Sequence, residues 1–307
     1  MYDVGRRRFM RAVAGFGSTM AFAPVLTLAG SSVVNKKPIP ATGEEVPIIG
    51  MGTWQTFDVG GDEKARSNLT RVLQAFFDHG GGVIDSSPMY GSSEQVVGDL
   101  LNEVGGKEAL FAATKVWTRG RQAGIDQMRR SMQRMGVGVF DLMQIHNLVD
   151  WETHWETLKT WKAEGKVRYV GITTSHGRAH SELEQILATQ PFDFVQFTYS
   201  LANRTVEERL LPIAQERGVA TLINRPYQGG SLFRRVKGKP LPAWAGEFDC
   251  ESWGQFFLKF VVSHPAVTCA IPATSKVRHM VDNMQAGAGR LPDAKTREKM
   301  RAYFESI

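Results

Sequence analysis

The stretch from Phe140 to Thr173 decides the fold, because it contains Phe140-Asp-Leu-Met-Gln-Ile-His146, a helix-like segment at 155–164, and Val167-Arg-Tyr-Val-Gly-Ile-Thr173. The two flanking runs are short, mainly apolar and end in polar residues, which is typical of buried strands. The segment between them has the apolar spacing of a helix. The stretch therefore predicts two parallel strands joined by a right-handed helical crossover.

The same unit recurs along the chain. Strand-like runs lie at 48–53, 83–86, 110–115, 140–146, 167–173, 192–196, 219–224 and 267–272, and helix-compatible segments lie at 64–79, 92–104, 121–135, 155–164, 182–189 and 206–217. Eight such units in roughly 260 residues match the size of a (β/α)8 TIM barrel. We therefore predict an α/β fold with a single TIM-barrel domain at 35–307. A doubly wound sheet is the alternative, but Gly50-Met-Gly52 lacks the third glycine and the acidic residue of a dinucleotide fingerprint.

Composition excludes several classes of protein. Of the formal net charge of +6, the first 34 residues contribute +3 through four Arg and one Asp, which leaves +3 for the remainder. A basic run at 234–239 has no interleaved aromatic residues, so we expect no nucleic-acid partner. Two cysteines cannot form a disulfide scaffold. Cys269 lies in an apolar run and is interpreted as a core residue, with a bridge to Cys250 as the alternative.

The first residues have the pattern of a targeting segment. Gly5-Arg-Arg-Arg-Phe-Met-Arg11 precedes a moderately apolar stretch at 12–29 that contains several glycines and Pro24. This pattern resembles a twin-arginine export signal, here at 1–34, with cleavage between Ala23 and Ser32. The alternative is a membrane anchor, but the apolar stretch is barely long enough to span a bilayer. The resemblance implies the twin-arginine export machinery as a partner and a periplasmic location, without a stable membrane anchor.

Polar residues stand at the ends of three consecutive predicted strands. Asp85 ends the second strand, Tyr90 lies in the loop after it, Lys115 ends the third and His146 the fourth. In a TIM barrel these positions meet at one mouth, where active sites are built. A phenol has an unperturbed pKa of about 10. A cation about 4 Å away, at an effective dielectric near 20, contributes roughly 4 kcal/mol, or about three pKa units. We therefore expect Lys115 to lower the pKa of Tyr90 and Asp85 to keep Lys115 charged.

This set of residues resembles the Asp-Tyr-Lys-His tetrad of the aldo-keto reductase family, and the resemblance covers about Ile39 to Gly287. It implies that Tyr90 is the general acid, that His146 orients the substrate carbonyl, and that a nicotinamide cofactor supplies hydride. The expected activity is the reversible reduction of an aldehyde or ketone to an alcohol. The alternative function is a nucleotide-binding sensor or accessory subunit with little turnover.

Three tryptophans follow predicted strands. Trp54, Trp117 and Trp151 lie near positions where the family has pocket aromatics, which favours a small-molecule carbonyl on an apolar body. His176 and His180 have the spacing of two metal ligands on a helix, but no third ligand is evident, so we expect no metal.

The resemblance also implies a cofactor site at the ends of the later strands. We expect NADPH, because Thr274, Ser275 and Lys276 can donate to its 2′-phosphate at the start of a helix. NADH is the alternative, because Ala273 and His279 replace residues that are basic in many NADPH-preferring members. Asn224 stands where many members stack an aromatic ring on the nicotinamide, and Arg225 is the candidate to compensate. The expected cofactor contacts are Thr173, Thr174, Gln196, Arg225, Ser231, Thr274, Ser275, Lys276, His279, Asp282 and Asn283.

Overall fold

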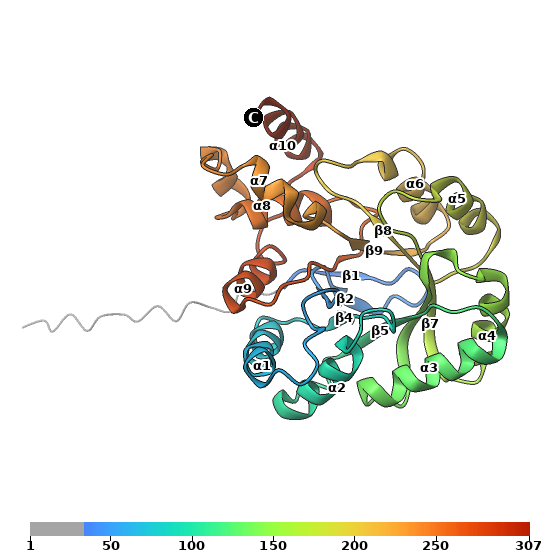
Figure 1. Ribbon diagram of the computed structural model, residues 1–307. Helices are drawn as coiled ribbons and strands as arrows, with labels where there is room; N and C mark the ends of the chain where they lie inside the picture. The colour runs from blue at the N-terminus through green and yellow to red at the C-terminus, as the bar shows by residue number, and fades with distance from the viewer. Residues whose placement is uncertain (1–33) are drawn as a thin grey trace, which may run out of the picture. The chain divides into compact units, whose positions relative to one another are not determined.

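The computed structural model describes residues 34–307, and the export signal predicted at 1–34 lies outside them apart from Val34 (Figure 1). Eight parallel strands form one sheet in chain order, each paired with the next. Their bounds are β3 (Met51–Gly52), β4 (Val83–Asp85), β5 (Phe111–Val116), β6 (Phe140–Ile145), β7 (Val167–Thr173), β8 (Phe194–Thr198), β9 (Ala220–Asn224) and β10 (Cys269–Ala270).

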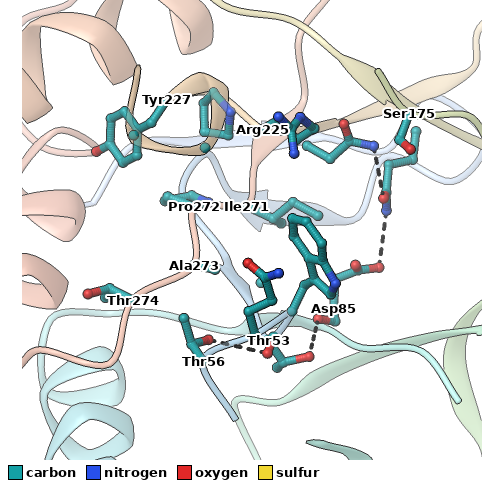
Figure 2. Close-up of a pocket in the computed structure, with 18 of the residues that line it drawn as sticks. Thr53, Thr56, Asp85, Ser175, Arg225, Tyr227, Ile271, Pro272, Ala273 and Thr274 are labelled. Atoms are coloured by element: carbon teal, nitrogen blue, oxygen red, sulfur yellow. Dashed lines mark hydrogen bonds between the residues drawn. The ribbon is translucent and has the colours of Figure 1, made fainter. Parts of the chain in front are cut away.

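The sheet closes on itself between its first and last strands. Gly50 N–H donates to Ala270 O at 2.8 Å, and Gly52 N–H donates to Pro272 O at 3.2 Å. Gly52 is required by this closure, because a Cβ there would lie 2.8 Å from Ile271 O. The predicted single-domain (β/α)8 barrel is therefore confirmed. The carboxyl ends of its strands surround the pocket drawn in Figure 2.

Helices surround the barrel (Figure 1). In α1, Leu69, Val72, Leu73 and Phe76 recur at helical spacing and are all buried, and Asp62 caps the helix by accepting from Ala65 N–H. The helices are α1 (Glu63–Asp78), α2 (Ser93–Val104), α3 (Arg121–Met135), α4 (Trp151–Ala163), α5 (His180–Thr189), α6 (Leu210–Glu216), α7 (Ser231–Arg235), α8 (Trp253–Val262), α9 (Val277–Gln285) and α10 (Ala294–Ser306).

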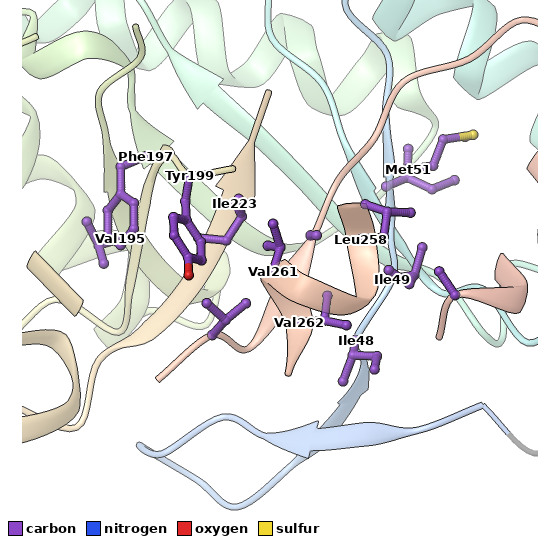
Figure 3. Packing of buried hydrophobic residues seen from close by; sticks show 14 of the residues in the cluster. Ile48, Ile49, Met51, Val195, Phe197, Tyr199, Ile223, Leu258, Val261 and Val262 are labelled. Atoms are coloured by element: carbon purple, nitrogen blue, oxygen red, sulfur yellow. The ribbon is translucent and has the colours of Figure 1, made fainter. Parts of the chain in front are cut away.

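The core has two layers, as the alternation of side chains along each strand requires. One layer fills the barrel and includes Val83, Phe111 and Leu142. The other lies between the barrel and the helices, where Leu258 and Val261 of α8 pack beside the strands (Figure 3). The barrel strands are therefore buried on both faces.

The structure adds an antiparallel hairpin that the sequence did not predict, formed by β1 (Lys36–Pro38) and β2 (Glu45–Pro47). Its apolar residues Ile39 and Val46 belong to the cluster that fills the barrel. Lys37 Nζ donates to the carbonyls of Val262, His264 and Val267 at 2.6–2.8 Å. The hairpin therefore closes one end of the barrel.

Other features differ in detail from the expectations. Helix α4 begins at Trp151, four residues before the predicted start. Cys250 and Cys269 are both buried and free, so the alternative of a bridge between them is not realised. No helix within 34–307 is both long and apolar enough to cross a membrane.

Candidate active site

A cavity of about 930 Å³ opens at the carboxyl ends of the barrel strands. It is lined by Asp85 at the end of β4, His146 after β6, Thr173 at the end of β7, Asn224 at the end of β9 and the 271–274 segment after β10. In Figure 2, Arg225 and Tyr227 lie along one side of this cavity, and Thr53 and Asp85 along the other. Segments far apart in the sequence thus contribute to one site.

Lys115 is a fully buried cation with a carboxylate partner. Its Nζ donates to Asp85 Oδ2 and to Ser86 O, both at 2.6 Å, and lies 5.1 Å from the centre of the Tyr90 ring. Burial alone would lower the pKa of Lys115, but Asp85 and Tyr90 outweigh it and raise the pKa above its ordinary value. Lys115 is therefore charged at neutral pH.

Tyr90 lies on the cavity wall beside Lys115. Burial raises the pKa of the phenol, Lys115 lowers it, and the net shift is upward. This differs from the expectation that Lys115 would lower the pKa below its ordinary value. The reason is that removing the phenolate from water costs more than one cation, itself shared with Asp85, recovers. The phenol is therefore protonated in the free protein and can donate.

His146 is the fourth member of the predicted set. Its ring lies edge-on to Tyr90, with centroids 6.0 Å apart, and its Nδ1 is 3.0 Å from Ser87 Oγ. Burial and the nearby Lys115 lower the pKa of His146 to about 2. The imidazole is consequently neutral at physiological pH, so it can orient a carbonyl by a hydrogen bond but does not contribute a charge.

Side-chain amides hold the other oxygen of Asp85, an arrangement that sequence reasoning missed. Gln144 and Gln196 donate to Asp85 Oδ1 at 2.8 and 3.1 Å, and Asn224 donates to Gln196 Oε1 at 3.3 Å. Gln144, a fully buried polar residue among the apolar residues at the end of β6, was the available signal. Asp85 therefore accepts three hydrogen bonds, from Lys115, Gln144 and Gln196, which fix its orientation at the cavity.

The three predicted pocket tryptophans differ in position. Trp54 lines the cavity and remains 39% exposed. Trp117 is 42% exposed and its ring lies 6.3 Å from that of His146, although it is not part of the cavity lining. Trp151 does not reach the pocket, because it is the first residue of α4 and packs half-buried against the core. Phe233 and Trp253, in the stretch after β9, line the cavity and were not predicted.

Eight of the residues expected to contact a nucleotide line the cavity: Thr173, Thr174, Gln196, Arg225, Thr274, His279, Asp282 and Asn283. Three do not. Ser231 donates to Gln228 O, Ser275 accepts at its carbonyl from Asn68, and the backbone N–H of Lys276 donates to Thr274 Oγ1.

The polar groups of this region fit an elongated anionic ligand. Thr174 Oγ1 and Arg225 Nε are buried without a hydrogen-bond partner within 34–307. Gly229 and Gly230 have φ values of 64° and 87°, and a Cβ on Gly230 would meet nothing within 4 Å. Open backbone beside a guanidinium suits a pyrophosphate. Within residues 34–307, no group of three His, Cys, Asp or Glu side chains could hold a metal ion.

Comparisons with known proteins identify the family of the chain. The family profile described as "Aldo/keto reductase family" matches residues 48–300. Aldo-keto reductase YhdN of Bacillus subtilis is 30% identical over 230 residues, which are 69% of this chain and 66% of that protein. Methylglyoxal reductase YeaE of Escherichia coli is 27% identical over 278 residues, 88% and 96% of the two chains.

The names of the similar proteins mention both NADH and NADP. The NADH-specific methylglyoxal reductase of Escherichia coli is 24% identical over 256 residues, 69% of this chain and 73% of that protein. The structure of an aldo/keto reductase from Klebsiella pneumoniae in complex with NADP and acetate superposes with a TM-score of 0.71 at 24% identity, covering 85% and 93% of the two chains. The fold and the extent of the match over 48–300 lead to one conclusion: the chain belongs to the aldo/keto reductase family.

Proposed function

We propose that the protein catalyses the reversible, NAD(P)H-dependent reduction of an aldehyde or ketone to an alcohol. The observation that carries this proposal is that Tyr90, Asp85 and His146 line one cavity in a chain of this oxidoreductase family, with Lys115 buried beside Asp85 and Tyr90. A bound nicotinamide cofactor would supply the hydride. The protein's own task is then to place the carbonyl and to deliver one proton to its oxygen.

Tyr90 delivers that proton. As the carbonyl oxygen gains negative charge it becomes a stronger base, and the phenol transfers its proton to it. The phenolate left behind is stabilised by Lys115, which Asp85 keeps charged. The neutral imidazole of His146 holds the carbonyl oxygen by a hydrogen bond. In the reverse direction the phenolate accepts the proton of the alcohol.

The residues proposed to hold the cofactor lie along the rest of the cavity. Thr173, Thr174 and Gln196 are proposed for the carboxamide end, and Arg225 for the ring or the phosphates. Ser231, Ser275 and Lys276 are retained only as backbone or outer contacts, because they do not line the cavity. The adenosine end is assigned to Thr274, His279, Asp282 and Asn283.

NADPH is the proposed cofactor, with NADH as the alternative. His279 lines the cavity beside Thr274, and basic residues at 276 and 278 flank it, which favours the extra phosphate of NADPH. Ala273 supplies no charge there. A ratio of kcat/KM for the two cofactors measures the preference, and we expect NADPH to be used at least about tenfold better.

The substrate is proposed to carry its carbonyl on an apolar body. Trp54 and Phe233 line the mouth of the cavity while remaining about two-fifths exposed, and Trp117 lies beside His146. Exposed aromatic surface at a pocket mouth favours an apolar ligand.

One experiment tests the activity. The purified protein is assayed for bound nucleotide, and cofactor absorbance is then followed with a panel of aromatic and aliphatic carbonyls for wild type and Tyr90→Phe. We expect nucleotide binding in both proteins and a loss of kcat of about 100-fold or more in Tyr90→Phe. Equal turnover in the two proteins would remove Tyr90 from its role. Binding without turnover would support the sensor alternative, which the predicted export signal favours because the periplasm offers no evident NADPH regeneration.

We further propose that residues 1–34 direct export through the twin-arginine machinery to the periplasm. The support is the run Arg6-Arg7-Arg8 before a moderately apolar stretch. Replacing Arg6 and Arg7 by lysine should retain the protein in the cytoplasm on cell fractionation, while the same change at Arg234 and Arg235 should not. An equal distribution between cytoplasm and periplasm for wild type and both double variants would contradict the proposal.

A further inference from the structure

Because His146 is neutral, its tautomer decides whether the ring can donate a hydrogen bond into the cavity. One buried hydroxyl contacts the ring. The aldo-keto reductase chemistry proposed above needs a donor N–H toward the carbonyl oxygen, because an imidazole nitrogen without a proton would repel it. Only one of the two ring nitrogens carries a proton in the neutral ring. Which nitrogen it is depends on the hydrogen bond made by the other.

Ser87 Oγ is the group that contacts His146 Nδ1, at 3.0 Å, and both side chains are buried. The hydroxyl also accepts a hydrogen bond from Met89 N–H at 3.3 Å. Within 34–307 these are its two partners. A backbone N–H can only donate, so His146 Nδ1 is the one acceptor available for the proton of the Ser87 hydroxyl.

The alternative tautomer leaves a buried donor unused. If Nδ1 carried the proton and donated to Ser87, the hydroxyl would accept twice and its own proton would face no acceptor. Unsatisfied buried donors are costly and rare. If Ser87 donates to Nδ1, then the Ser87 hydroxyl, the Met89 N–H and His146 Nδ1 all have hydrogen-bond partners. The ring proton then lies on Nε2.

The ring proton then points where the chemistry needs it. Nε2 of His146 makes no hydrogen bond within 34–307, and His146 lines the cavity beside Tyr90. We propose that Ser87 is a positioning residue that selects the Nε2–H tautomer of His146, so that the imidazole donates to the substrate carbonyl oxygen. This inference rests on the proposed carbonyl reduction for its catalytic meaning, but the tautomer itself is a property of the resting protein.

The structure of the loop explains how Ser87 is held. Ser87 and Tyr90 belong to one turn, in which Tyr90 N–H donates to Ser87 O at 3.0 Å. Pro88 between them fixes a backbone angle of that turn. The hydroxyl that orients His146 and the phenol that donates the proton are therefore carried by the same short segment.

The test compares Ser87→Ala with Ser87→Thr, which keeps a hydroxyl, and with Ser131→Ala as a matched control. Ser131 is a buried serine of α3 whose hydroxyl has no partner within 34–307. Its removal should change neither the His146 spectrum nor the kinetic constants. The first readout is the ¹⁵N spectrum of the imidazoles, with the His146 signals identified by their loss in His146→Gln. The second is kcat and KM for cofactor and carbonyl.

We expect wild type and Ser87→Thr to show a single Nε2–H tautomer of His146, and Ser87→Ala to show a mixture of tautomers. We expect kcat to fall about tenfold in Ser87→Ala, with KM for the cofactor unchanged. An Nδ1–H tautomer in wild type, or an unchanged spectrum in Ser87→Ala, overturns the assignment of Ser87. A clean tautomer shift without carbonyl turnover by any of the proteins overturns the proposed function and leaves the role of Ser87 standing.

Discussion

At the scale of single residues, the Lys115–Asp85 pair has two separable effects. Replacing Lys115 by methionine keeps the length of the side chain but removes the charge. We expect kcat to fall by about 100-fold or more, because the phenolate of Tyr90 loses its cation. We also expect the free energy of unfolding to fall by about 3–5 kcal/mol, because Asp85 is left buried without its ionic partner. Steady-state kinetics and urea denaturation measure the two effects.

A double variant separates catalysis from folding. Asp85→Asn combined with Lys115→Met leaves no buried charge at this point, so most of the lost stability should return. The activity should not return, because the cation is still absent. Recovery of turnover in the double variant would show that Lys115 acts only through stability.

The pH dependence of reduction follows from two pKa shifts. His146, with its pKa lowered to about 2 by burial and Lys115, does not titrate in the working range. Burial raises the pKa of Tyr90 despite Lys115, so the phenol keeps its proton as the pH rises. Since reduction uses the protonated phenol, kcat should be flat between about pH 5 and pH 9. His146→Gln should lower kcat without changing this profile, whereas a limb near pH 6.5 that disappears in His146→Gln would contradict the interpretation.

The principal site residues were predictable for a physical reason. Asp85, Lys115 and His146 interrupt or end apolar runs, and parallel strands bring their carboxyl ends together whatever the loops do. The role of Ser87 was not predictable, because it depends on which atom of His146 the hydroxyl meets. The net pKa of Tyr90 was predicted with the wrong sign, since sequence gives neighbours but not the depth of burial.

At the scale of elements, the Tyr90 loop is fixed to the stretch before α1. Asp58 accepts from both the N–H and the hydroxyl of Ser92 at 2.8 Å, and these bonds lower the pKa of Asp58. Gly91, with a φ of 59°, lies so close that a Cβ would be 2.3 Å from an Asp58 oxygen. Gly91→Ala should therefore displace the loop that carries Tyr90.

Gly136→Ala is the matched control, because Gly136 has a φ of 65° and open space around a Cβ. Both changes should cost about 1–2 kcal/mol of stability through left-handed strain. Only Gly91→Ala should lose more stability than this, and only Gly91→Ala should also lower kcat. Thermal unfolding and kinetics of the two variants decide the point, and equal kcat values would show that the Asp58 contact does not position Tyr90.

Elements of the barrel differed in how well they could be predicted. Helix α3 was located to the residue, because its apolar spacing and a terminal glycine agree. The 151–154 segment was missed at the start of α4, because its first turn begins after a left-handed Asp150 that sequence spacing does not reveal. The stretch between β9 and α8 lacks a period, so the short α7 and the position of Phe233 in the cavity wall were not predicted.

At the scale of the whole molecule, the barrel has one end for chemistry and one end that is closed. The β1–β2 hairpin contributes apolar residues to the barrel interior and is attached through Lys37 to the stretch that follows α8. Its strands of three residues contain charges and proline, so no sequence period reveals them. The structure of the closed end therefore depends on contacts between segments that are distant in the sequence. These contacts exist only once the barrel has formed, so the sequence alone does not reveal them.

This attachment predicts a pH dependence of stability. Burial, assisted by Arg297, lowers the pKa of Lys37 from 10.5 to about 8 in the folded protein. Between these two pKa values the unfolded chain binds more protons than the folded protein. The contribution of Lys37 to stability therefore increases as the pH rises from about 8 to 10.5. The increase is up to about 1.4 kcal/mol for each pKa unit between the folded and the unfolded value. Lys37→Met removes this titration and leaves three carbonyls without their donor. The difference in unfolding free energy between wild type and Lys37→Met should consequently grow over this range in urea denaturation, and a constant or shrinking difference would show that Lys37 keeps its ordinary pKa.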